Sequence, residues 1–128
     1  TVALEIVDGF AAVESWGLPR VGVNLDVGHM HLPENLEALR RFGGLGNLVR
    51  SIGEALVHLH VHDVDGGSDH LEIGTGMVDF ADLIGALRDI GYARAATMEM
   101  QPERVSPAGM RRGLGVLREH VAAHRPGP

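Results

Sequence analysis

Apolar and polar residues alternate along residues 57–63, where Val57, Leu59 and Val61 are separated by histidines. This period of two predicts a β-strand with one apolar face and one imidazole face. A fully buried parallel strand is usually a nearly continuous apolar run, so three histidines on one face need an explanation. Two readings stay open: a metal site or polar cavity, and a strand whose polar face lies in water.

Similar patterns divide the rest of the chain into alternating strands and helices. Further strands are expected at residues 2–7, 21–26 and 94–100, and helices at residues 10–16, 34–41, 48–56, 80–90 and 103–124. Asp79 is the expected N-cap of the helix at 80–90, and residues 63–76 are expected to form a long loop. This alternation predicts an α/β protein with a parallel sheet covered by helices.

The spacing of the units is typical of a (β/α)8 TIM barrel, which takes about 250 residues for eight units. The chain has 128 residues, so its four units would make half of such a barrel in a single domain, residues 1–128. A doubly wound open sheet is the alternative. The chain begins at Thr1, almost inside a strand, which suggests a processed chain or a piece of a longer one.

Composition excludes several classes of protein. The net charge of −6 does not favour a nucleic-acid surface. The absence of cysteine excludes disulfides and a thiolate zinc site. Because no apolar run approaches the ~20 residues of a membrane span, and no secretory signal is visible, we expect a cytoplasmic protein without a membrane partner.

Four ligand-type side chains lie near the carboxyl ends of four different predicted strands: Glu5, Asp26, His60 and Glu99. Barrel enzymes place their chemistry at this end. Three carboxylates in one place would repel one another, and a divalent cation would remove that repulsion. Three carboxylates with one imidazole suit Mn²⁺ or a similar ion better than a closed zinc site.

Several motifs also resemble one known superfamily. Residues 24–29 (Asn-Leu-Asp-Val-Gly-His) resemble the Asp-Thr-Gly-His segment of the xylose isomerase-like barrels, which include sugar isomerases and epimerases and apurinic-site endonucleases. Residues 58–63 resemble the superfamily's His-x-His-x-x-Asp strand, and residues 70–80 resemble its His-x-x-x-Gly-x-Gly-x-Ile-Asp-Phe loop. Residues 98–100 resemble its final strand. The motifs keep their order and correspond to the C-terminal half of the barrel, strands five to eight.

This resemblance implies roles for individual residues. Glu5, Asp26, His60 and Glu99 would be the metal ligands, with Mn²⁺ preferred over Mg²⁺, Co²⁺ or Zn²⁺. As in the epimerase branch, Glu5 and Glu99 would also exchange a proton with a substrate carbon through a metal-stabilised enediolate. His29 and His70 would bind the substrate. Of the three histidines in residues 57–63 only His60 would be a ligand.

We therefore expect a metal-dependent sugar or sugar phosphate isomerase or epimerase. One alternative is an apurinic-type phosphodiester hydrolase with zinc. Another is a non-catalytic half-barrel. Because a four-stranded piece leaves two sheet edges exposed, we expect pairing with another half-barrel or a second copy of the chain.

Overall fold

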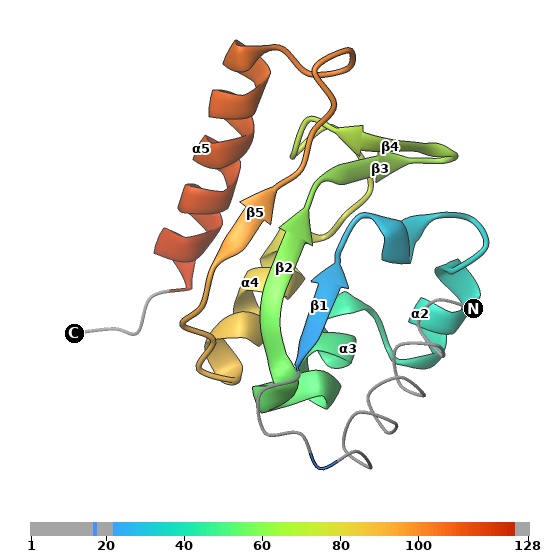
Figure 1. Ribbon diagram of the computed structural model, residues 1–128, viewed down its shortest axis with the longest axis vertical. Helices are drawn as coiled ribbons and strands as arrows, with labels where there is room; N and C mark the ends of the chain where they lie inside the picture. Colours follow the sequence, from blue (N-terminus) through green and yellow to red (C-terminus); the bar gives the residue numbers. More distant parts are fainter. Residues whose placement is uncertain (1–16, 18–21, 125–128) are drawn as a thin grey trace.

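The computed structural model describes residue 17 and residues 22–124 (Figure 1). The strand expected at residues 2–7, the helix expected at 10–16 and the candidate ligand Glu5 lie outside the described residues. The outcome of these three expectations is therefore left open.

Three parallel strands form the central sheet, in the order β1-β2-β5. They are β1 (Val23–Asp26), β2 (Leu56–Val61) and β5 (Ala96–Met98). Asp26 lies opposite His60, and His60 lies opposite Thr97. The α/β class with a parallel sheet is therefore confirmed. Within residues 22–124 the sheet is open, so the assignment to the C-terminal half of a barrel stays a prediction.

Four helical segments lie between β1 and β2, and a fifth lies before β5. They are η1 (His29–His31), α2 (Leu36–Arg41), α3 (Leu45–Ile52), η2 (Gly53–Ala55) and α4 (Phe80–Asp89). The long helix α5 (Pro107–Ala123) follows β5. Figure 1 shows α3 and α4 behind the sheet and α5 alongside β5. Helices α3 and α4 cover one face of the sheet, and the histidines lie on the other face.

The apolar residues of the strands pack against this helical layer. Leu25 and Leu59 are fully buried, as the alternation predicted, whereas His58 and His60 on the opposite face are only half-buried. Burying one such leucine contributes about 1.5–3 kcal/mol to folding. The helical layer supplies Leu48, Val49, Leu83 and Ala86 to the same core.

Helix α4 begins as the sequence predicts, because the Asp79 side chain accepts a hydrogen bond of 3.0 Å from the Asp82 amide. Helix α5 begins later than expected, at Pro107 instead of residue 103. Ser106 is its N-cap, and its hydroxyl accepts from the Gly109 amide at 3.1 Å. A proline at the first helical position disfavours helix in the residue before it, which explains the shift.

The prediction of a long loop at residues 63–76 is partly wrong, because this segment contains an antiparallel hairpin. Strands β3 (Asp63–Asp65) and β4 (Ser68–Leu71) pair around Gly66-Gly67, and Gly66 has φ 58°. A glycine pair between two strands is a tight-turn signal. Figure 1 shows the hairpin beyond the carboxyl ends of the parallel strands. Leu56, expected to continue a helix, instead begins β2, after Gly53 ends the helix with φ 58°.

Candidate metal centre

The candidate ligands gather at the carboxyl edge of the sheet because the strands are parallel. Asp26 ends β1, His60 lies opposite it in β2, and Glu99 follows β5. The backbone continues the ladder past the strand ends, since the Glu99 amide donates to the Val61 carbonyl at 2.9 Å. Side chains separated by up to 73 positions in sequence therefore share one edge.

Two contacts link the acidic and imidazole groups at this edge. Nδ1 of His60 lies 3.2 Å from Oε2 of Glu99, and Nε2 of His62 lies 2.7 Å from Oδ1 of Asp26. Ligand atoms of Asp26, His62 and Glu99 all lie within 4.8 Å of one another. The structure thus brings Asp26 and Glu99 together, but the imidazole grouped with both is that of His62. His60 contacts Glu99 and belongs to neither candidate ligand group of the described residues.

His62 was not expected from the sequence to be part of the site. It follows the last residue of β2, and its side chain has no exposed surface. The alternating pattern placed it on the same face as His60 but gave no sign that it is fully buried. The hydrogen bond to Asp26 joins residues 36 positions apart, so no local pattern could have revealed it.

His29 and His70 lie next to this group, joined by Asp69. The two nitrogens of His29 lie 3.0 Å from Oδ2 of Asp26 and 3.0 Å from Oδ2 of Asp69. Nδ1 of His70 lies 3.1 Å from Oδ1 of Asp69. Ligand atoms of His29, His62 and His70 also lie within 4.8 Å of one another. The site is therefore an extended cluster of imidazoles and carboxylates.

The environment favours the ionised forms of Asp26 and Asp69. Burial raises the pKa of Asp26, but hydrogen bonds from the His62 side chain and the His29 amide lower it to a net value below 3.8. Burial also raises the pKa of Asp69, while the contacts with His70 and His29 lower it to about 2. Ionised carboxylates beside imidazoles are the donor set that divalent cations bind.

The Asp63 carboxylate fixes the backbone around the cluster. It is fully buried and accepts four amide hydrogen bonds, listed by donor: Val64 (2.9 Å), Gly74 (2.9 Å), Gly76 (2.9 Å) and Val78 (3.1 Å). A side chain at position 76 would meet the Val64 carbonyl and the Asp63 carboxylate, so only glycine fits there. Asp63 therefore shapes the loop that follows the hairpin.

His58, on the same face of the sheet as His60, also has partners. Nε2 of His58 lies 2.9 Å from the Thr97 hydroxyl, and the rings of His58 and His60 meet edge to face at 5.3 Å. His58 is thus satisfied by a hydrogen bond, and it does not belong to either candidate ligand group of the described residues.

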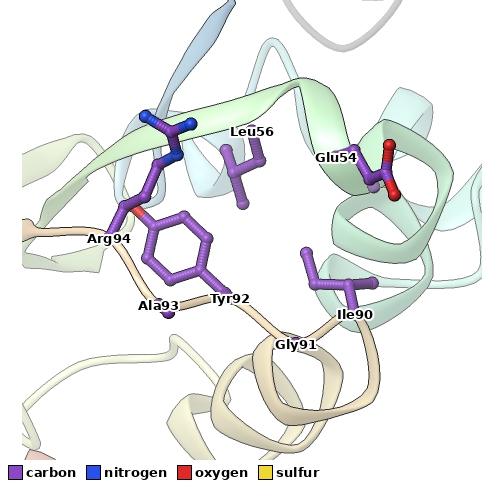
Figure 2. Close-up of a pocket in the computed structure, with 8 residues that line it drawn as sticks. Glu54, Leu56, Ile90, Gly91, Tyr92, Ala93 and Arg94 are labelled. Atoms are coloured by element: carbon purple, nitrogen blue, oxygen red, sulfur yellow. The ribbon is translucent and has the colours of Figure 1, made fainter.

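A separate pocket of about 410 Å³ lies at the other end of the sheet. Figure 2 shows the Tyr92 ring, Leu56 and Ile90 around it, with Glu54 and Arg94 at its rim. It holds no histidine and one carboxylate, and it adjoins the start of β2. Barrel enzymes react at the opposite end, so this pocket is not the candidate site.

Known proteins match the chain over most of its length. A family model described as xylose isomerase-like TIM barrel matches residues 3–120. The L-ribulose 3-epimerase of Methylomonas sp. (strain DH-1) is 31% identical over 93 residues, covering 73% of this chain and 28% of that protein. The ketose 3-epimerase of Arthrobacter globiformis is 29% identical over 120 residues, covering 89% of this chain and 37% of that protein.

The D-psicose 3-epimerase of Enterocloster bolteae is 33% identical over 87 residues, which are 68% of this chain and 25% of that protein. The chain thus spans well under half the length of these relatives. Between residues 22 and 124, none of the helices has the length and apolar character needed to cross a bilayer. With the family model matched across nearly the whole sequence, the chain belongs to the xylose isomerase-like TIM barrel family.

Proposed function

We propose that the protein is a metal-dependent isomerase or epimerase of sugars or sugar phosphates. The observation that carries this proposal is the approach of Asp26, Glu99 and two imidazoles at the carboxyl edge of the sheet. The names of three relatives, which are 3-epimerases of ribulose, psicose and ketoses, support a sugar substrate.

The donor set fits a divalent cation. Asp26 and Glu99 would supply carboxylate oxygens, and His60, whose Nδ1 lies 3.2 Å from Oε2 of Glu99, would supply an imidazole nitrogen. Glu5 would complete the set; it lies outside the described residues. Oxygen-rich donors with one nitrogen favour Mn²⁺, with Mg²⁺, Co²⁺ and Zn²⁺ as alternatives. A bound divalent ion would withdraw electron density from the carbonyl and hydroxyl oxygens of a sugar and so acidify the C–H bond between them.

In this proposal Glu99 would move the proton at that carbon. Its side chain is 42% exposed, on the histidine face of the sheet, and one oxygen contacts His60. In an epimerisation, Glu99 would remove or return the proton on one side of the sugar, and Glu5 would act on the other. The intermediate between the two transfers is an enediolate of the sugar.

His29 and His70 would bind sugar oxygens. Both nitrogens of His29 already contact carboxylates, so a sugar hydroxyl would take the place of Asp26 or Asp69 at one of them. Nε2 of His70 lies 3.8 Å from Oε2 of Glu99, which puts the ring beside the proton-transfer group.

Solvent deuterium exchange tests the proposal. Incubated with Mn²⁺ and a panel of ketoses in D₂O, the protein should incorporate deuterium next to the carbonyl and form the epimer, as followed by NMR. Glu99→Gln should reduce both rates at least about hundredfold, whereas Glu54→Gln, in the pocket at the other end of the sheet, should leave them unchanged. Exchange that is equal in the Glu99→Gln variant would contradict the role of Glu99.

A second candidate, a zinc-dependent phosphodiester hydrolase of the apurinic type, has one specific observation in its favour. Nδ1 of His70 is buried and makes no hydrogen bond within the described residues, although Asp69 lies nearby. With His29 and Asp69 it would supply donors for a further cation. Cleavage of abasic DNA in Zn²⁺, with more than one zinc bound per chain by mass spectrometry and no ketose epimerisation, would favour this function.

The unpaired edge of strand β5 supports the expectation that another chain or segment pairs with the sheet. Of the described strands, β5 pairs with β2 alone, and Ala96 and Thr97 in β5 are exposed. An unpaired strand edge is a template for another strand. We propose that another half-barrel or a second copy of the chain covers it. Light scattering after size exclusion should show an assembly, whereas a monomer at micromolar concentration would contradict this; an assembly with no epimerase activity would favour the non-catalytic half-barrel.

A further inference from the structure

The ring of His62 lies next to the candidate ligands and is enclosed by neighbouring groups. It has no exposed surface. It stacks on the His70 ring with 4.2 Å between the centroids and 9° between the planes, and it meets the His29 ring edge to face at 5.0 Å. A side chain at Gly28 would overlap the ring, so the Gly28 backbone closes the remaining side.

Both nitrogens of this ring are engaged, and by different parts of the chain. Nε2 lies 2.7 Å from Oδ1 of Asp26, at the end of β1. Nδ1 accepts a hydrogen bond of 2.9 Å from the backbone amide of His70, in strand β4 of the hairpin. His62 therefore connects the hairpin to a candidate ligand carboxylate.

The His70 amide decides where the His62 proton lies. An amide nitrogen only donates, so Nδ1 must present a lone pair to it, and the proton of the neutral ring must be on Nε2. The alternative is Nδ1–H donating to the Asp63 carbonyl, but that distance is 3.4 Å, too long to compete with the bond of 2.9 Å. The Nε2–H group then donates to Asp26.

This arrangement separates His62 from metal ligation. A histidine that binds a cation through Nε2 has no proton there, and its Nδ1 carries one instead. Such a proton would point at the hydrogen of the His70 amide. His62 would therefore have to break its bond to the hairpin before it could act as a ligand, although one of its nitrogens lies within 4.8 Å of ligand atoms of Asp26 and Glu99.

We propose that His62 is a positioning residue that holds one oxygen of Asp26 and links the hairpin to the metal centre, without binding the metal. This inference rests on the proposed function. With Oδ1 held by His62 and by the His29 amide at 3.1 Å, the Asp26 carboxylate keeps one orientation. Its other oxygen, Oδ2, lies 3.0 Å from Nδ1 of His29, and a cation would bind Oδ2 in place of that contact. Ligating carboxylates held by such hydrogen bonds lose about ten- to hundredfold in metal affinity when the bond is removed.

Nitrogen-15 NMR of the imidazoles tests the proton position directly. In the metal-free protein, His62 should show the Nε2–H tautomer, with an unprotonated Nδ1. On titration with diamagnetic Zn²⁺, the His60 signals should change to those of a ligand, while His62 keeps its tautomer. A His62 ring that changes to the Nδ1–H form with Nε2 on the ion would overturn the proposal.

Two variants separate the two hydrogen bonds of His62. A glutamine amide reaches about as far as Nε2, so His62→Gln keeps the donor to Asp26. An asparagine amide reaches about as far as Nδ1, so His62→Asn keeps an acceptor for the His70 amide and loses the donor. By calorimetry with Mn²⁺, we expect His62→Asn to bind about ten- to hundredfold more weakly than the wild type and His62→Gln within about threefold.

Equal losses in both variants would overturn the positioning role. Melting of the metal-free variants shows whether folding accounts for any loss: if both melt alike and only His62→Asn binds Mn²⁺ weakly, the role of the Asp26 bond is supported. Wild-type protein that binds neither ion would overturn the inference. Mn²⁺ binding with the expected order of variants, but without epimerisation, would overturn the enzymatic proposal and leave the positioning role intact.

Discussion

Asp63 accepts the amide hydrogen of Gly76 at 2.9 Å, across thirteen positions of sequence and with no solvent reaching the carboxylate. The same carboxylate binds three further amides. One side chain thus replaces the backbone pairing that a strand would otherwise provide for this loop.

Replacing Asp63 by asparagine should destabilise the protein by about 2–4 kcal/mol. The side-chain NH₂ group of asparagine would face backbone N–H groups that also donate, so some of these buried amides would lose their acceptor. Urea unfolding measures the change. Asp65→Asn, two residues away in β3 and exposed, is the matched control and should stay within about 0.5 kcal/mol of the wild type. Equal changes in both variants would contradict the anchoring role of Asp63.

Two glycines in α5 should respond differently to replacement by alanine. A side chain at Gly115 would meet nothing within 4 Å, so Gly115→Ala should stabilise the protein by about 0.5–1 kcal/mol through helix propensity. A side chain at Gly113 would lie 3.1 Å from Cβ of Ile73 and 3.1 Å from Cε of Met100. Gly113→Ala should therefore stabilise the protein less than Gly115→Ala does, or destabilise it. Urea unfolding of the two variants measures the difference in the free energy of unfolding.

Glu72 should titrate below its ordinary range because of Arg112. The guanidinium donates to both carboxylate oxygens, at 3.1 and 2.7 Å, and these hydrogen bonds lower the pKa of Glu72 from 4.5. A depressed pKa in the folded state favours folding above the unfolded pKa, and this contribution is lost as the pH falls through the folded value.

Arg112→Gln should accordingly raise the pKa of Glu72 toward 4.5, as followed by NMR titration of its carboxyl carbon. Arg111→Gln, on the adjacent exposed position of α5, should leave that pKa in place. A Glu72 titration that is the same in all three proteins would contradict the ion pair.

Mn²⁺ should raise the melting temperature of the protein by binding its folded state. At a hundred times the dissociation constant the added stability is about 2.7 kcal/mol. Asp26→Asn and Glu99→Gln should each diminish the rise, whereas Glu54→Gln should preserve it, since Glu54 borders the pocket at the other end of the sheet. A rise of the same size in all variants would place the binding elsewhere.

Local periodicity predicted the elements that have a strong pattern of their own. The alternation around Leu59 predicted β2, and the cap at Asp79 predicted the start of α4. The hairpin was missed because its strands are three and four residues long, too short for a pattern to emerge. Its glycine pair was the available signal.

For the site, the sequence predicted which strand ends would meet but not which groups would touch. Parallel strands bring Asp26, His60 and Glu99 to one edge by geometry alone. The partners of His62 depend on the hairpin, whose amide at His70 comes eight residues later in the chain. Such contacts arise from tertiary packing, which a one-dimensional pattern does not encode.

His70 has φ 53°, the one positive value among the non-glycine residues that the structure describes. Asparagine and glycine tolerate that left-handed geometry better than other residues. An exchange to either should therefore leave the main chain at position 70 in place while deleting the imidazole. The backbone and the ring at this position can thus be altered independently, so the imidazole of residue 70 can be removed while its amide keeps donating to His62.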